Sequence, residues 1–451
     1  MALLSKAEID ILLSTLEKLQ EGFSHLPEFT PAADHDRITA VLMQVATRMQ
    51  QNYPYHHPRY AGQMLKPPHP VARLAYALSL WINPNNHARD GGIASSGMES
   101  ECVASIGAMF GMSHPLGHLC GGGTMANLEA LWVAGKLNPG KTVLASTQAH
   151  YTHSRISDVL GLPFESVAVT PDGCMDMAAL EARLKKEDVA AVVVTMGTTG
   201  LGAIDSLPEV LRLWQHYGFR VHVDAAYGGY FTLAEALAPS ARRAFERIGE
   251  ADSIVIDPHK HGLQPYGCGC VLFRDSSVGA LYKHDSPYTY FSSAELHLGE
   301  ISLECSRPGA AAVALWATQQ LLPMERGGEF AEGLDRSLLA ARELWRRVQA
   351  SSRFKALMQP QLDIVVFAVS AGNAREASNL ARKLFEETAK RELHLALIEL
   401  PAELVRHYWP DLIMNRDTVT CIRSCLMKPE HLDWIDDIWS VLDSAALTLH
   451  E

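Results

Sequence analysis

The sequence predicts an α/β protein with a mostly parallel central sheet and a smaller C-terminal α+β domain. Between residues 116 and 274, short apolar runs alternate with helical segments, which is typical of a parallel sheet covered on both faces. Beyond about residue 325, a long charged helical segment precedes further apolar runs and a final amphipathic helix. We therefore expect an N-terminal helical segment and loop (1–60), a large domain (61–325) and a small domain (326–451).

Length and composition exclude several classes of protein. The 451 residues are 47% hydrophobic and 20% charged, which suits a globular protein with a sizeable core. A net charge of -12 and the lack of basic clusters predict neither a nucleic-acid nor a membrane partner. The eight scattered cysteines predict neither a zinc ribbon nor a disulfide framework. Because no signal-peptide or membrane-spanning pattern is found, we expect a cytoplasmic protein.

The N-terminal part begins with a predicted helix. Residues 5–8 (Ser-Lys-Ala-Glu) resemble a capping box, and apolar residues follow at helical spacing from 9 to 19. The apolar stripe of this helix either packs on its own chain or forms a dimer contact. Residues 53–70 are rich in Pro, His and Tyr, and they predict an ordered loop that is either a connector or a binding loop.

The remaining elements follow from apolar periodicity. Strands are expected at 143–146, 191–195, 221–223, 254–256 and 271–273, with helices between them such as 175–186 and 207–217. In the small domain we expect helices at 329–350 and 429–447 and strands at 364–367, 395–398 and 419–422. Ligands of parallel sheets bind at the carboxyl ends of the strands, so the residues after each strand are the candidates for a site.

Lys260 lies on the turn after the strand predicted at 254–256. Pro258 ends that strand, because proline cannot donate to a sheet ladder. Burial disfavours the charged form of a lysine, and a neutral amine in a cleft can attack a carbonyl carbon, as Schiff-base lysines do. An isolated lysine on a turn is more often a solvated surface residue, so the prediction depends on its neighbours.

Asp224 ends the strand predicted at 221–223. A carboxylate at the end of an apolar strand needs a cation or N–H donors. The partner is either the protonated ring nitrogen of a cofactor, for which Ala226 leaves room, or a metal ion. For a metal, no second carboxylate or histidine stands at a matching spacing nearby.

Three other strand ends carry polar or glycine residues. A glycine run ending in Gly123 and Thr124 precedes a helical pattern and could hold one phosphate at the helix start, although it lacks the P-loop lysine. His150 follows another strand, and an imidazole can lie against a ring, carry a proton or simply pack. Thr198 and Thr199 offer hydroxyls at a third strand end, where turn-forming residues are also common.

Together these residues resemble a known family. His150, Asp224-Ala225-Ala226 and Pro258-His259-Lys260, in this order and spacing, resemble the group II pyridoxal-phosphate-dependent amino acid decarboxylases. Segments 197–205 and 253–260 are similar to the archaeal tyrosine/aspartate decarboxylases. His57-Pro58-Arg59-Tyr60, with Gln63 in step, resembles a loop of glutamate decarboxylases. The resemblance covers most of the chain and implies the type I aminotransferase-like fold.

The resemblance also implies a role for each site residue. Pyridoxal 5'-phosphate is the implied cofactor, with Lys260 on its aldehyde, Asp224 on the pyridine nitrogen, and His150 and Ala226 on the two ring faces. Gly123, Thr124 and His259 are implied to bind the phosphate, and Thr199, beside Thr198, to lie near the ring.

Some of the residues implied to bind the substrate come from the loop at 53–70, and one comes from the small domain. Arg423 is implied to hold the substrate α-carboxylate, with His57 and Gln63 nearby; otherwise Arg423 forms a surface ion pair. Tyr288 and Tyr290 fall near the family's mobile active-site loop, where a tyrosine can protonate the carbanion or simply pack. Asp257 departs from the asparagine common in the aromatic branch.

The implied function is a lyase of amino acid metabolism. It would decarboxylate an L-amino acid with an acidic or aromatic side chain, as a homodimer with its sites at the subunit interface and without a metal. One alternative is a carbon–carbon lyase that resembles sphingosine-phosphate lyase. Another is a non-catalytic scaffold of the same fold.

Overall fold

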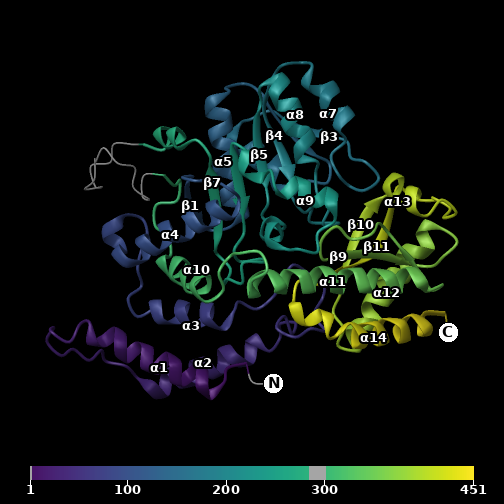
Figure 1. Cartoon of the computed structure of the whole chain (residues 1–451). Coiled ribbons are helices and arrows are strands. Elements are labelled where there is room, and N and C mark those ends of the chain that lie inside the picture. The colour runs from purple at the N-terminus through teal and green to yellow at the C-terminus, as the bar shows by residue number, and fades with distance from the viewer. Residues whose placement is uncertain (1–2, 284–300, 451) are drawn as a thin grey trace.

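The computed structural model describes residues 3–283 and 301–450. A large α/β part lies beside a smaller α+β part, as Figure 1 shows. The central sheet has the strand order β1-β7-β6-β5-β4-β2-β3. Among these described strands only β7 runs in the direction opposite to the other six. This confirms the predicted mostly parallel sheet.

All five predicted strands of the large part are present. The sheet consists of β1 (Leu116–Cys120), β2 (Thr142–Ser146), β3 (Phe164–Val167), β4 (Val189–Thr195), β5 (Arg220–Asp224), β6 (Ser253–Ile256) and β7 (Gly269–Phe273). Neither β1 nor β3 was predicted. In β1 a glycine and a histidine interrupt the apolar residues, and β3 is an edge strand with exposed residues at its centre, so neither has a continuous apolar run.

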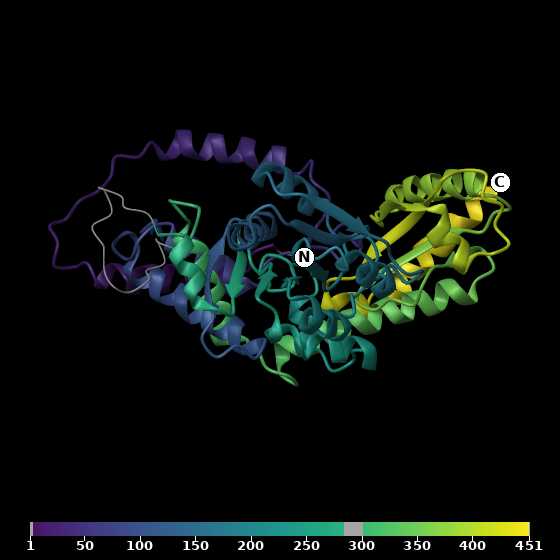
Figure 2. The same ribbon diagram turned by 90° about the horizontal axis from the view of Figure 1, so that it is seen from above.

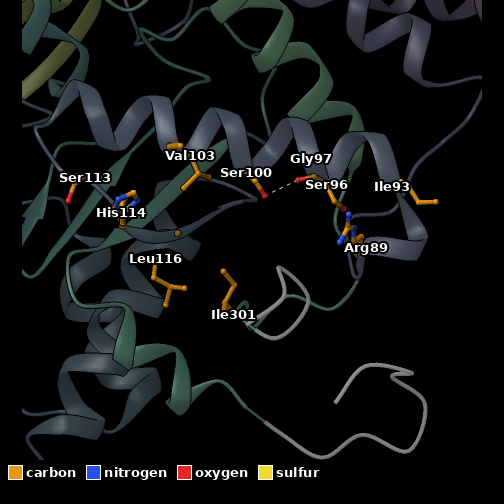
Figure 3. Close-up of a pocket in the computed structure, with 13 residues that line it drawn as sticks. Arg89, Ile93, Ser96, Gly97, Ser100, Val103, Ser113, His114, Leu116 and Ile301 are labelled. Atoms are coloured by element: carbon orange, nitrogen blue, oxygen red, sulfur yellow. Dashed lines mark hydrogen bonds between the residues drawn. The ribbon is translucent and has the colours of Figure 1, made fainter. Parts of the chain in front are cut away.

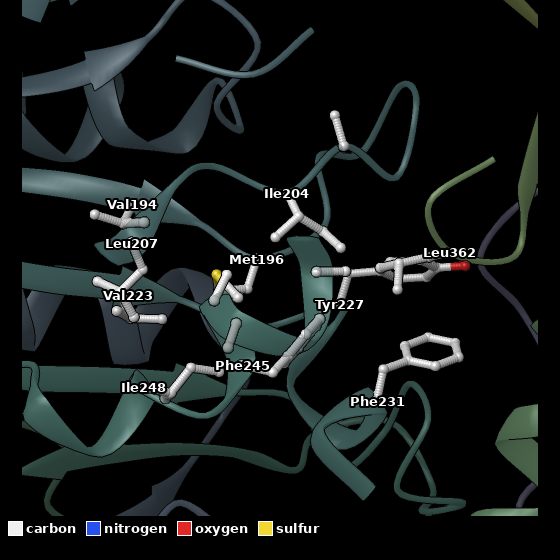
Figure 4. Packing of buried hydrophobic residues seen from close by; sticks show 14 of the residues in the cluster. Val194, Met196, Ile204, Leu207, Val223, Tyr227, Phe231, Phe245, Ile248 and Leu362 are labelled. Carbon is white, nitrogen blue, oxygen red and sulfur yellow. The ribbon is translucent and has the colours of Figure 1, made fainter. Parts of the chain in front are cut away.

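Helices cover both faces of this sheet. They are α4 (Ile93–Met109), α5 (Gly123–Leu137), α6 (Thr152–Leu160), α7 (Met177–Leu184), α8 (Leu207–Tyr217), α9 (Pro239–Phe245) and α10 (Gly309–Leu321). The core between strands and helices is apolar (Figure 4): Val194 and Val223 pack with Leu207, and Leu362 reaches the same cluster from the smaller part. Burial of each such side chain stabilises the fold by about 1.5–3 kcal/mol. Because Leu362 belongs to this cluster, the same apolar core joins the two parts.

The smaller part has a four-stranded antiparallel sheet in the order β10-β11-β9-β8. Its elements are α11 (Glu329–Ala350), β8 (Phe354–Ala356), β9 (Ile364–Val369), α12 (Ala374–Lys390), β10 (Ala396–Pro401), α13 (Ala402–Tyr408), β11 (Thr418–Cys425) and α14 (Ile435–Leu447). The helix predicted from 429 starts as a short 3-10 turn and becomes α14 only at Ile435. The domain limits at 60/61 and 325/326 stay predictions.

The N-terminal helices α1 (Lys6–Glu21) and α2 (His35–Met49) lie below α3 (Pro70–Ser79) in Figure 1. Helix α1 packs on α3, and α2 stands apart along the upper edge of Figure 2. The capping box is present: Ser5 Oγ accepts from the Glu8 N–H at 3.2 Å, and Glu8 Oε2 accepts from the Ser5 N–H at 2.7 Å. Neither α1 nor α2 contains a buried residue. No helix in the described ranges is long and apolar enough to cross a bilayer.

Candidate active site

A cavity of about 500 Å³ lies at the carboxyl ends of the parallel strands, where ligands of such sheets bind. Residues that follow five different strands line it. They include Gly123, Thr124, His150, Thr199, Asp224, Ala226, Asp257, His259 and Lys260. The fold therefore brings most of the predicted cofactor-binding residues to one place.

Another cavity of about 500 Å³ lies against α4 (Figure 3). Its described lining includes Arg89, His114 and several serines, but no lysine and no carboxylate. An amine nucleophile and an anionic partner for a ring nitrogen are therefore both missing from this lining. The cavity at the strand ends is the candidate active site.

Asp224 is buried at the end of β5, and N–H donors surround its carboxylate. Oδ2 accepts from His153 Nε2 at 2.8 Å and from Asn127 Nδ2 at 3.4 Å, and Oδ1 accepts from the Ala226 N–H at 3.1 Å. Burial acts to raise the pKa of Asp224, but the His153 hydrogen bond and the nearby positive charges hold it well below its usual range. The carboxylate is therefore ionised at neutral pH.

A chain of hydrogen bonds behind Asp224 fixes its orientation. His222 Nε2 lies 2.7 Å from Asn127 Oδ1, and its Nδ1 lies 2.9 Å from Ser253 Oγ. Asn127 presents its oxygen to His222 and its N–H to Asp224, so His222 Nε2 must carry the proton and Nδ1 must accept from Ser253. Burial lowers the pKa of His222 to about 3. A neutral His222 therefore satisfies both contacts.

Lys260 lies opposite an acidic neighbour. Its Nζ is 3.0 Å from Asp257 Oδ2, and 21% of its side chain is exposed. His259 donates from Nδ1 to the Cys268 carbonyl at 2.8 Å, which leaves its Nε2 3.5 Å from the same Asp257 oxygen. Asp257 Oδ1 is buried and has no hydrogen-bond partner in the described part of the chain. The lysine is thus ion-paired within the cavity and is not the solvated surface residue of the alternative interpretation.

The glycine run forms an anion cradle at the start of α5. The helix begins at Gly123 without a side-chain cap, so its first N–H groups remain available. Gly122 has φ of 143°, and a Cβ at Gly123 would come within 2.7 Å of Asp257 Oδ2, so both positions require glycine. The Gly121 N–H donates to a carboxylate oxygen of Glu304 at 3.0 Å. The loop therefore already binds one negatively charged oxygen.

The predicted ring-face and hydroxyl residues divide into two groups. His150 lines the cavity with its Nδ1 2.8 Å from Thr152 Oγ1, and burial lowers its pKa, so its ring is neutral near pH 7. Ala226 and Thr199 also line the cavity. Thr198 does not: it is fully buried, and its Oγ1 accepts from the Ala203 N–H at 3.1 Å. Thr198 therefore closes the turn beside the cavity.

Among the predicted substrate residues, Arg423 and Gln63 lie together. Arg423, on β11, is 7% exposed, and its Nη1 is 3.5 Å from Gln63 Oε1. Its Nε and Nη2 have no hydrogen-bond partner among the described residues, so Arg423 is not the alternative surface ion pair. His57 instead packs edge-on against Trp434, with ring centroids 4.9 Å apart. Arg423, Gln63 and His57 are all absent from the described residues that line the cavity.

Three residues of the site were not predicted from the sequence, and two predicted residues lie outside the described ranges. His153, Asn127 and His222, which support Asp224, were not predicted. The spacing of His150 and His153 was one available signal, since residues three apart in a helical turn share a face. Tyr288 and Tyr290 lie outside the described residues.

Comparison with known proteins identifies the family. A profile of the "Pyridoxal-dependent decarboxylase conserved domain" matches residues 127–370, which is more than half of the chain. The chain belongs to this family. It is therefore a carboxy-lyase with pyridoxal phosphate as its cofactor, and the predictions of enzyme class, amino acid decarboxylation and cofactor are confirmed at that level. Neither alternative activity is favoured.

Characterised relatives and solved structures agree with this assignment. The chain is 27% identical over 416 residues to the L-tyrosine decarboxylase of Enterococcus faecium, covering 70% of this chain and 68% of the relative. It is 29% identical over 337 residues to the probable L-tyrosine/L-aspartate decarboxylase of Methanothermobacter thermautotrophicus, covering 73% and 88%.

Two solved structures share the fold at low sequence identity. Oryza sativa TDC with PLP and tryptamine has a TM-score of 0.80 at 16% identity over the full length of both chains. Mouse CSAD in apo form has a TM-score of 0.76 at 19% identity, covering 97% of this chain and 99% of that one. The predicted type I aminotransferase-like fold is thereby confirmed.

The residues in the cavity fit this cofactor. An uncapped helix start suits its phosphate, an ionised carboxylate suits its pyridine nitrogen, and an amine suits its aldehyde. All three line one cavity of a size that accepts a small ligand.

Proposed function

We propose that this enzyme decarboxylates an L-amino acid with an acidic or aromatic side chain to the corresponding amine. The observation that carries the proposal is one cavity in which an ionised Asp224, Lys260 and the cradle at Gly123 face the same space. The names of the relatives, which are tyrosine and aspartate decarboxylases, support the choice of substrate class.

Each residue has a distinct task in holding the cofactor. Lys260 would hold its aldehyde end and Asp224 its pyridine nitrogen, while Gly123, Thr124 and His259 would hold its phosphate. Bound pyridoxal phosphate supplies an electron sink for the electrons left when carbon dioxide departs. Asp224 keeps a proton on the ring nitrogen, because an ionised carboxylate at close range favours the protonated form of that nitrogen.

His150 and Ala226 both line the cavity and are proposed to lie against the cofactor ring. The His150 ring is neutral near pH 7 because burial lowers its pKa, so it can lie against an aromatic ring without adding a positive charge beside the protonated nitrogen. Ala226, with a single methyl group, leaves the opposite side open. The ring would then lie between them, with Thr199 at its edge.

Arg423 is the group proposed to hold the substrate α-carboxylate. A guanidinium binds a carboxylate with two parallel hydrogen bonds. In Arg423, Nε and Nη2 are buried and lack partners within the described part of the chain, and leaving such donors unpaired costs about 1–3 kcal/mol each. A substrate carboxylate would satisfy both, with Gln63 beside it through Nη1.

His153 acts as a positioning residue in this proposal. Its Nε2 holds Asp224 Oδ2 at 2.8 Å from a fully buried place. Together with Asn127 it fixes the direction in which the carboxylate faces the cavity. Return of the proton to Cα is proposed for Tyr288 or Tyr290, which lie outside the described residues.

Release of carbon dioxide tests this proposal. The purified holoenzyme would be given aspartate, glutamate and tyrosine separately, with the Lys260→Ala variant as the blank. We expect at least one of these amino acids to release carbon dioxide, and the variant to lose the visible absorbance of bound cofactor and roughly 10⁴-fold or more of the rate. Lys186→Ala, at an exposed lysine, should behave as wild type. Release from none of the three substrates contradicts the substrate class.

We also propose that the enzyme is a cytoplasmic homodimer. Large apolar side chains on α1 and α2 are exposed, among them Ile9, Leu13, Ile38, Leu42 and Met43, and apolar patches of this kind mark interaction surfaces. A second copy would cover them. The eight cysteines are all unpaired, which supports a reducing compartment.

The dimer is tested by changing α2 alone. Leu42→Glu with Met43→Glu should shift the molar mass measured by light scattering from that of two chains to that of one. Lys6→Glu, at an exposed charged position of α1, should leave two chains associated. A wild-type enzyme with the mass of one chain would refute the dimer.

A further inference from the structure

A third cavity, of about 300 Å³, lies between the large and small parts of the molecule. We call it the interdomain cavity. Its walls are the segment 66–70, His261 and Leu263 of the large part, the first turns of α11, and residues 428–430 after β11. None of these residues lines the candidate active site, so the two cavities are distinct.

Two lysines face this cavity without a carboxylate partner. Lys428 is 3% exposed, and its Nζ donates to the Tyr60 carbonyl at 2.7 Å. The Nζ of partly buried Lys66 donates to the Met427 carbonyl at 3.3 Å. In the described ranges no carboxylate oxygen lies within 4.0 Å of either Nζ. An ammonium group has three N–H donors, so each lysine keeps donors to spare.

The positive charges of the two lysines are close enough to oppose each other. Burial, and after it the charge of Lys66, lower the pKa of Lys428 to about 7. Burial likewise lowers the pKa of Lys66 to about 8. A nearby anion would reverse this, because an opposite charge within about 4–6 Å favours the ammonium form.

The acidic groups near the cavity only partly offset the two lysines: Glu430 acts to raise the pKa of both, and Asp363 that of Lys66, yet burial still lowers both pKa values. Glu329 and Glu430 line it, but both are exposed at its edge. Asp363 is buried behind the wall, where it accepts from the Tyr227 hydroxyl at 2.5 Å and lies 3.2 Å from His261 Nε2. Asp363 thus accepts one hydrogen bond at Oδ1 and faces His261 with Oδ2, which forms no hydrogen bond within the described part of the chain.

A third polar residue, His261, lies at the same wall. His261 is 1% exposed and lines the cavity, and its Nδ1 has no hydrogen-bond partner among the described residues. A buried ring nitrogen without a partner is costly. Helix α11 also begins at this wall without a side-chain cap, which adds the positive end of a helix dipole.

We propose that the interdomain cavity binds a small oxyanion, either an inorganic phosphate or a carboxylate, through Lys66 and Lys428. The apolar walls, which include Pro67 and Phe330, exclude water around the bound group and strengthen its attraction to the lysines. This site does not depend on the substrate proposed above.

The bound oxyanion would stabilise segments that adjoin the proposed site residues. Lys66 lies three residues after Gln63, His261 directly follows Lys260, and Lys428 lies five residues after Arg423. One ligand that bridges Lys66 and Lys428 joins the loop to the small part, next to the turn that carries His261. Its binding therefore stabilises the arrangement of the two parts.

Thermal unfolding of the holoenzyme tests the site, since bound cofactor fills the phosphate cradle of the active site. Phosphate or acetate would be added at constant ionic strength, balanced with sodium chloride. We expect a saturable rise in Tm of about 2 °C with at least one of the two. The Lys66→Met/Lys428→Met variant should lose the rise, and Lys383→Met, at an exposed lysine, should keep it. The oxyanion that raises Tm identifies the source.

Two outcomes overturn the proposal: a wild-type Tm that responds to neither oxyanion, or a double variant that responds as wild type does. If the double variant does not fold, limited acetylation of the wild-type holoenzyme, read by mass spectrometry, gives the answer. Phosphate or acetate should slow modification of Lys66 and Lys428 and leave Lys383 unchanged. Equal modification of Lys66 and Lys428 with and without both oxyanions would also overturn it.

Discussion

Asp224, at the cofactor end of the candidate active site, and Arg423, at the proposed substrate end, differ in how completely their polar atoms are paired. At the cofactor end, Asp224 accepts N–H groups from His153, Asn127 and Ala226. At the substrate end, Arg423 has one long contact to Gln63 at 3.5 Å and two buried donors without partners in the described part of the chain. The Asp224 carboxylate is therefore paired within one chain, whereas the Arg423 guanidinium is only partly paired.

This difference has a structural origin. Asp224 stands at the end of a strand inside the parallel sheet, and its partners come from α5, from α6 and from the turn after β5. Arg423 comes from the antiparallel sheet of the small part, and Gln63 from a loop. We infer that the cofactor end is rigid before ligands bind, and that the substrate supplies the missing partners at the other end.

Removing the Asp224 carboxylate should have the largest effect on this contrast. Asp224→Ala takes away the charge that holds a proton on the ring nitrogen, so we expect kcat to fall roughly 10³- to 10⁴-fold. Some cofactor should still bind, because Lys260 and the phosphate cradle remain. Steady-state carbon dioxide release and the visible absorbance measure the two effects. Unchanged turnover would rule out the electron-sink role.

Removing the Arg423 guanidinium should have the next largest effect, confined to the substrate end. Arg423→Met is expected to lower kcat/KM roughly 10²- to 10³-fold, as loss of a charged, bidentate contact does. Cofactor absorbance should stay as in wild type. Arg375→Met, at an exposed arginine of the small part, is the matched control. A parallel loss of cofactor would show that the two ends are not independent.

His153 tests whether the supports of Asp224 matter beyond stability. His153→Leu removes the donor at 2.8 Å, and we expect kcat to fall roughly 10-fold, as loss of a hydrogen bond to a charged group does. The pH profile of kcat should shift, because the proton on the ring nitrogen is held less firmly. His153→Gln, which keeps an N–H in a similar place, should recover most of the rate. Equal rates for Leu and Gln would indicate a packing role.

His222 gives the smallest effect, on stability against pH. Its pKa is about 3 in the fold, against 6.5 for an ordinary histidine. Between these values the unfolded chain binds a proton that the folded chain does not, so stability falls as the pH drops below about 6.5, by at most roughly 1.4 kcal/mol per pH unit. His222→Gln should flatten the decline of Tm between pH 7 and pH 5. His216→Gln, at an exposed histidine, should not; an equal slope in all three proteins would refute this assignment.

The cofactor end could be predicted from the sequence because its residues follow apolar strands directly. A buried parallel strand is a continuous apolar run, so β4, β5 and β6 were found, and with them the turns that carry Asp224 and Lys260. The long helix α11 and the helix α8 were predicted with their observed limits. Local periodicity is enough for these elements.

Contacts between distant segments could not be predicted in this way. His57 was expected at the substrate, yet it packs on Trp434, 377 positions further along the chain. Thr198 was expected at the cofactor, yet its hydroxyl closes a turn. The hydrogen bonds that support Asp224 join α5, α6 and two strands. No local sequence pattern indicates which of these elements come into contact.

The sequence alone determined the parallel sheet, the strand-end position of its polar residues and the family that they resemble. Only the tertiary structure decided which polar groups are paired, which are left with open donors, and that Lys66 and Lys428 share a cavity. The physical reason is that strand and helix patterns are set by neighbours along the chain, whereas hydrogen bonding and burial of a charge depend on segments brought together by folding.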